Sequence, residues 1–130
     1  MKFIYIILVL ASIFACKNNI IGSTEVTEIT YVEFSQINNY NNGAWFEVTG
    51  HIKNISSTQT IPSSWHIECQ FYADDTKVLK LGGENTIVYI PLESEQSTIW
   101  TIRWLPGTNS NININDFPDW TYDDLRAYLK

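Results

Sequence analysis

The sequence predicts an all-β protein, an antiparallel two-sheet Ig-like sandwich of about seven strands that follows an N-terminal signal peptide. Three observations lead to this prediction. Apolar and polar residues alternate along several short segments, turn residues separate these segments at short intervals, and helical periodicity is almost absent after residue 24. The chain also carries 5 Trp, 7 Tyr and 6 Phe among 130 residues, which supplies rings to fill a core and argues against disorder.

The first 24 residues have the organisation of an export signal followed by a tether. Lys2 precedes an uncharged, mostly aliphatic stretch that is too short to span a membrane comfortably. Its end, Ile13-Phe14-Ala15-Cys16, resembles the lipobox of bacterial lipoproteins. This resemblance implies cleavage before Cys16 and a diacylglycerol on the Cys16 thiol. We therefore divide the chain into a signal peptide (1–15), a lipidated Cys16 with its tether (16–24) and a β-sandwich domain (25–130).

Alternation predicts the strands of the first half of the domain in order. Segment 25–35 is the first expected strand, and the Asn-rich segment 37–43, which ends in Asn-Gly, predicts a turn. Segment 44–54 follows as a strand. The clearest strand is 65–73, because large apolar residues occupy every second position. The residues expected to face the core in these last two strands are Phe46, Val48, Gly50, Ile52, Trp65, Ile67, Cys69 and Phe71.

The second half of the domain predicts further strands and one ambiguous segment. Residues 77–81 are expected to return along the previous strand, and Gly82-Gly83 then predicts a bend before a strand at 86–92. Segment 98–105 places Trp100, Ile102 and Trp104 on one buried face. The loop 106–115 includes a short edge strand at Ile112 and Ile114. Segment 117–130 fits either a capped helix or a closing strand, and we favour the strand.

Two further segments resemble a known domain family. VTGHIKNIS at 48–56 resembles the strand-and-turn motif of FxLYD-type domains, which are small Ig-like sandwiches of bacterial envelope lipoproteins. FYADDTKVL at 71–79 resembles the hairpin of the same family, and the resemblance extends from about Ile29 to the end of the chain. It implies this fold and a secreted setting, and it implies no catalytic residues.

Charge and residue inventory narrow the chemistry that we expect. The net charge is −6, and it becomes −7 once Lys2 is removed with the signal peptide, so no nucleic-acid partner is predicted. We predict no catalytic residue, no metal site and no cofactor. Cys69 lies on an apolar face, His51 and His66 lie on outward faces, and no nucleophile elbow is present. The acidic residues Asp116, Asp119, Asp123 and Asp124 predict a solvated turn in preference to a calcium site.

The rings that alternation places outward suggest a binding surface. Trp45, Tyr72 and Tyr89 are these candidates, although a one-residue slip in register would turn them into core residues. We expect a lipid-anchored, non-catalytic interaction or structural protein of the bacterial envelope, on the periplasmic side of the outer membrane. Its expected partners are the membrane, through the lipid on Cys16, and another envelope protein. The alternatives are a carbohydrate- or peptidoglycan-binding module and an acidic inhibitor or immunity protein against a cationic toxin or lysozyme.

Overall fold

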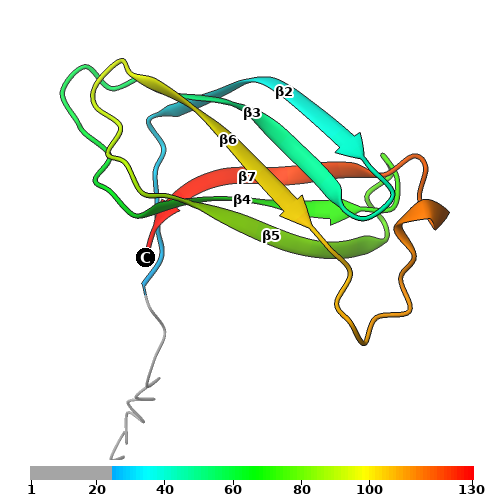
Figure 1. Ribbon diagram of the computed structural model, residues 1–130. Coiled ribbons are helices and arrows are strands. Elements are labelled where there is room, and N and C mark those ends of the chain that lie inside the picture. The colour runs from blue at the N-terminus through cyan, green and yellow to red at the C-terminus, as the bar shows by residue number, and fades with distance from the viewer. Residues whose placement is uncertain (1–24) are drawn as a thin grey trace, which may run out of the picture.

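Seven strands form two antiparallel sheets that pack face to face in the computed structural model, which describes residues 25–130 (Figure 1). One sheet has the strand order β1-β7-β4-β5 and the other has the order β2-β3-β6. The predicted all-β, two-sheet fold is confirmed. The elements are β1 (Thr27–Glu28), β2 (Val32–Asn41), β3 (Phe46–Asn54), β4 (Trp65–Tyr72), β5 (Lys80–Val88), β6 (Ser97–Trp104), the 3-10 turn η1 (Ile114–Asp116) and β7 (Thr121–Leu129).

The connectivity of the strands differs from that of immunoglobulin constant domains. Sandwiches of the immunoglobulin constant type also divide seven strands into four and three. Here the hairpins β2–β3 and β4–β5 lie in different sheets, and β7 closes the fold by inserting between β1 and β4. Because Thr27 pairs with Leu129, the chain enters and leaves the sandwich at the same end. The predicted signal peptide, the predicted tether and Cys16 lie outside the described residues.

The core fills the space between the sheets. Burial alternates without exception along β3, as its sequence predicts, and Phe46, Val48 and Ile52 are fully buried. At one end of the core Phe46 stacks between Trp104 and Trp120, with ring centroids 5.8 Å and 4.3 Å away. Phe71 contacts the same two indoles from β4. The inward faces predicted for 44–54, 65–73 and 98–105 are therefore confirmed.

The N-terminal part of the domain differs from its prediction. The expected strand 25–35 is two strands in different sheets, because the chain crosses the sandwich between them and buries Ile29. The expected turn 37–43 is wrong: β2 continues to Asn41 and pairs with β3. The asparagines are tolerated there because they lie on an exposed edge strand. A bulge at Gln36, where φ is 51°, absorbs the change of register, and the turn occupies only 42–45.

Gly82 and Gly83 do not bend the chain as predicted. One strand, β5, runs through both of them, and it replaces the separate strands expected at 77–81 and 86–92. The glycines serve close packing instead, because a side chain at Gly82 would overlap the indole of Trp104 and one at Gly83 would overlap the amide of Gln70.

The C-terminal segment is a strand, as favoured. Its alternation is interrupted by a bulge at Asp124, where φ is 53°, so that Tyr122 and Ala127 both face the core although they are five residues apart. The edge strand expected at Ile112 and Ile114 does not form. Ile114 is instead the first residue of η1, and its side chain is buried in the core.

Candidate binding surfaces

The three rings predicted as a binding surface lie in three separate places. Trp45, in the β2–β3 turn, is half-buried beneath the guanidinium of Arg103, which lies 5.6 Å from the ring centroid. Tyr72 lies on the outer face of the four-stranded sheet and donates a hydrogen bond to the Asp124 carboxylate. Tyr89 follows β5 at the opposite end of the sandwich and is 73% exposed. The structure therefore brings no two of them into one ring platform.

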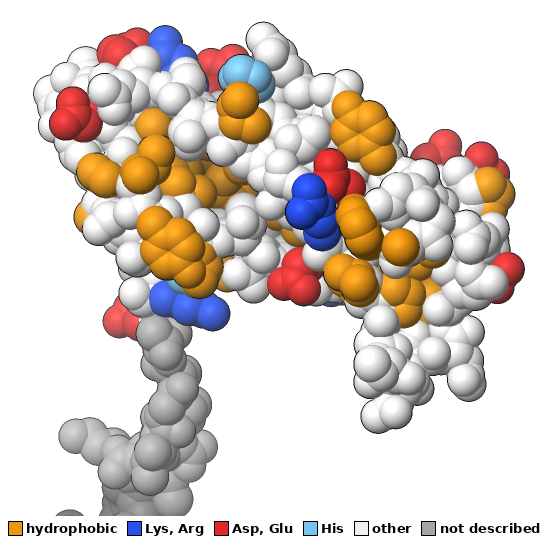
Figure 2. Space-filling model, viewed as in Figure 1, with side chains coloured by type: hydrophobic (Ala, Val, Ile, Leu, Met, Phe, Trp, Pro, Cys, Tyr) orange, Lys and Arg blue, Asp and Glu red, His pale blue; other side chains and the backbone are white. Residues whose placement is uncertain are grey.

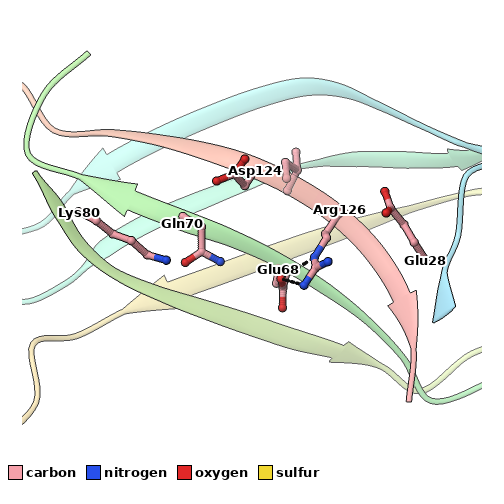
Figure 3. A pocket seen from close by; sticks show the side chains of 7 residues that line it. Glu28, Glu68, Gln70, Lys80, Asp124 and Arg126 are labelled. Atoms are coloured by element: carbon pink, nitrogen blue, oxygen red, sulfur yellow. Dashed lines mark hydrogen bonds and ion pairs between the residues drawn. The ribbon is translucent and has the colours of Figure 1, made fainter. Parts of the chain in front are cut away.

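The outer face of the four-stranded sheet is polar and hollowed (Figure 3). Arg126 pairs with the Glu68 carboxylate across β7 and β4 at 2.6 Å, and Lys80 reaches over the adjoining part of the face from β5. The hollow measures about 410 Å³ and mixes three acidic with two basic side chains. Its lining consists of Glu28, Glu68, Gln70, Lys80, Asp124, Leu125 and Arg126.

Beside this hollow a histidine is more buried than its outward position predicts. His66 is only 9% exposed because the ring of Tyr128 stacks on it with a centroid distance of 5.0 Å. Its Nδ1 lies 3.4 Å from the Asn85 side-chain oxygen. Burial, together with the nearby Glu68 carboxylate, raises the pKa of Tyr128, so the phenol keeps its proton at neutral pH.

A second hollow, at the end of the sandwich opposite the chain entry, is acidic. Asp74, Asp75 and Asp119 line it together with Thr76, Trp120 and Thr121. Of the other acidic residues considered for calcium, Asp116 is exposed in η1, and the remaining two are engaged elsewhere. Asp123 pairs with Lys77, which lowers the pKa of the Asp123 carboxyl, and Asp124 accepts from Tyr72. Within 25–130 no three acidic, imidazole or thiol side chains come together as ligands for a metal ion.

Exposed apolar side chains concentrate around β5 and β6. Of the ten large hydrophobic residues that are exposed, seven lie on these two strands or within two residues of them. We call this group the β5–β6 side; Figure 2, which looks onto these strands, shows hydrophobic side chains here in several patches. Its members are Val78, Leu79, Ile87, Tyr89, Ile90, Ile99 and Leu105.

Only one member of the β5–β6 side was among the predicted site residues, namely Tyr89. The sequence also indicated a second member of the β5–β6 side. Alternation in 98–105 places Ile99 on the outward face together with Thr101 and Arg103. An isoleucine that is 68% exposed in the middle of a strand leaves apolar area in water that a partner could cover. Ile87 could also be placed outward, by the same alternation that places Tyr89 outward, and it lies on the outer face of the four-stranded sheet opposite His66. The others lie at strand ends, where alternation does not define a face.

Cys69 is fully buried, as its position between Ile67 and Phe71 predicts. Burial, with smaller effects from Glu68 and Glu84, raises the pKa of the Cys69 thiol to about 12. We therefore expect a maleimide to leave Cys69 unlabelled in the native protein and to label it fully in urea. Fast labelling without denaturant, measured by mass spectrometry, would contradict the register of β4.

Comparisons with known proteins add no relatives: no family model, curated protein or solved structure matches the chain. Among residues 25–130, no helix has the length and apolarity needed to cross a membrane.

Proposed function

We propose that this chain is a lipid-anchored protein of the bacterial envelope whose sandwich binds another protein through the β5–β6 side. The anchor is the lipid on Cys16, which the lipobox resemblance implies. The domain acts by contact and carries no catalytic centre. The concentration of seven exposed apolar side chains around β5 and β6, an edge strand of each sheet, is the observation that supports the contact surface.

The surroundings of the β5–β6 side also favour a protein partner. On β2, the other edge of the three-stranded sheet, the outer face exposes Glu33, Ser35 and Asn38, and Tyr40 is its one exposed large hydrophobic residue. A sugar-binding site would need rings grouped on one face, and Trp45, Tyr72 and Tyr89 are dispersed. An apolar surface beside charged pairs such as Arg103–Glu47 is instead typical of protein interfaces.

The anchor is tested by Cys16→Ser in the full-length chain. This variant is expected to remain an unprocessed precursor that takes up no labelled fatty acid, because only a thiol accepts the diacylglycerol. Incorporation of the label into Cys16→Ser would contradict lipidation at this residue.

The contact surface is tested by capture from detergent-solubilised envelopes. We expect the full-length protein to retain a partner that Tyr89→Ser with Ile90→Ser loses at least tenfold. Tyr40→Ser is the matched control, because Tyr40 is 52% exposed but lies on β2. If Tyr40→Ser lost the captured partner to the same extent, the partner would not bind through the β5–β6 side.

The acidic hollow favours one second candidate, an inhibitor of a cationic envelope-directed protein. Asp74, Asp75 and Asp119 would meet basic side chains of such a partner, and the net charge would speed the encounter. Hen-type lysozyme serves as a cationic probe: binding that falls with added salt and with Asp75→Asn plus Asp119→Asn supports this candidate. Binding that is unaffected by both removes it.

A further inference from the structure

The two sheets have four edge strands, and three of them are interrupted. β1 is only two residues long. β2 carries the bulge at Gln36. β5 contains Gly82-Gly83, carries Lys80 and Glu84, and shifts register against β4 at its start. Short strands, bulges and charges are the features by which sheet edges avoid pairing with other chains.

The fourth edge, β6, has none of these features. It pairs with β3 without a register shift from Phe46–Trp104 to Lys53–Ser97. It contains neither glycine nor proline over its eight residues. Its one charged side chain, Arg103, is already paired with Glu47. An uninterrupted edge that also exposes Ile99 is a template for an additional strand.

The backbone of β6 shows which groups are available. The Asn54 amide donates to the Gln96 carbonyl, so the even-numbered residues that follow in β6 bond to β3. The amide and carbonyl groups of Ser97, Ile99, Thr101 and Arg103 consequently point away from β3. Within the described part of the chain no hydrogen bond engages them.

We propose that β6 pairs antiparallel with β6 of a second copy, about a two-fold axis at Ile99. The two three-stranded sheets then join into one sheet of six strands. This deepens the proposed function, on which it rests for the contact surface, by naming the partner as a second copy of this chain. Sheet-edge pairing about a two-fold axis is self-complementary, as a closed dimer requires.

Side chains select this register. With the axis at Ile99, the two exposed isoleucines face each other and Thr101 faces Ser97 of the second copy. Apolar and hydroxyl pairs are favourable cross-strand combinations. Moving the axis two residues in either direction places Ile99 opposite Arg103 or opposite Glu95, which removes the apolar pair.

The axis also lies away from one contact between the two sheets on this side. Gly82 of β5 packs against Trp104, at the far end of β6 from Ser97.

The test uses the full-length chain in its membrane, with Ile99→Cys oxidised by copper phenanthroline. Residues on a two-fold axis in a hydrogen-bonded pair have Cα atoms about 5.5 Å apart, which lies within the range for a disulfide. We expect most of Ile99→Cys to migrate as a disulfide-linked dimer on a non-reducing gel. Val78→Cys is the matched control, because it is 88% exposed but lies before β5 and should stay monomeric.

Three results would overturn the pairing: monomeric Ile99→Cys, equal dimer in Val78→Cys, or a mixed disulfide between Ile99→Cys and a different protein. The last result would leave the proposed contact surface standing.

Dimer formed by the unsubstituted chain would come from Cys16 and would contradict its lipidation instead. In that case Ile99→Cys in the Cys16→Ser chain decides the pairing. A chain with both Ser97→Cys and Thr101→Cys places these two thiols opposite each other across the axis and serves as a second reporter. Adding Ile99→Lys to it should reduce its cross-linking at least tenfold, since lysine blocks an edge.

Discussion

Replacing Trp100 with Ala is expected to lower the free energy of unfolding by about 3–5 kcal/mol, the usual cost for a large core aromatic. The indole is only 3% exposed. It meets the ring of Phe34 edge-on with centroids 5.8 Å apart, and it packs over Gly50, where a Cβ atom would lie only 3.1 Å from the indole. Urea denaturation followed by circular dichroism measures the effect.

Two variants make this result specific. Trp45→Ala, which removes a half-buried indole from the surface, should cost less than about 1.5 kcal/mol. Trp100→Phe should cost much less than Trp100→Ala, because the buried Trp100 Nε1 has no hydrogen-bond partner among the described residues. If Trp100→Ala instead removed sugar binding and left unfolding unchanged, Trp100 would belong to a carbohydrate site and not to the core.

Asn54→Asp is expected to cost about 3–5 kcal/mol at neutral pH, because it buries an unpaired negative charge. Asn54 is fully buried at the end of β3. Its side-chain nitrogen donates to the carbonyls of Gln59 and Leu92, at 2.7 Å and 3.0 Å, and its oxygen accepts from the Ser56 amide. A carboxylate keeps only the last of these bonds and places an oxygen against two carbonyls.

The pH dependence of this variant gives a second check. Burial raises the pKa of the new carboxyl in the folded state, so protonation favours folding and the loss of stability should shrink as pH falls. Asn111→Asp makes the same charge change on an exposed loop residue and should alter stability by less than about 0.5 kcal/mol. A deficit of Asn54→Asp no larger than that of the control would show that Asn54 does not hold these loops together.

The central strands were predicted correctly from the sequence because buried and exposed side chains alternate along them. In β3, β4 and β6 one face is buried and the other is not, so a period of two is visible in residues such as Val48, Ile67 and Ile102. Asn54 belonged to the strand-and-turn motif at 48–56, but the bonds of its side chain to the loop backbone became evident only in the structure. The strand assignment of β7 depended on the same alternation, up to the bulge at Asp124.

The errors came where a residue's usual role was overridden by its neighbours in space. Asn42-Gly43 does lie in the turn, as predicted, with Gly43 at φ 85°. The asparagines before it indicate a turn locally, but β2 is held extended by pairing with β3, and Gly82 is held in a strand against the indole of Trp104. The burial of His66 could not be predicted either, because its cover, Tyr128, lies 62 positions further along the chain.

The candidate site was less predictable than the fold. Outward rings can be recognised from alternation, but their spacing depends on which sheet each strand joins. Trp45 and Tyr72 therefore point to opposite outer faces. The exposure of the β5–β6 side depends on which strands lie at the edges of the sheets. For β5, this position results from the pairing of β4 with β7 on its other side, which the sequence does not reveal.

Site-specific photo-cross-linking in living cells tests the central claim most directly. Benzoylphenylalanine in place of Tyr89 reports on the β5–β6 side, and the same residue in place of Tyr40 reports on β2, where the replaced ring is also exposed. We predict a light-dependent protein adduct in the membrane fraction from position 89 and none from position 40. Adducts of equal yield from both positions, or from position 40 alone, would contradict binding through the β5–β6 side.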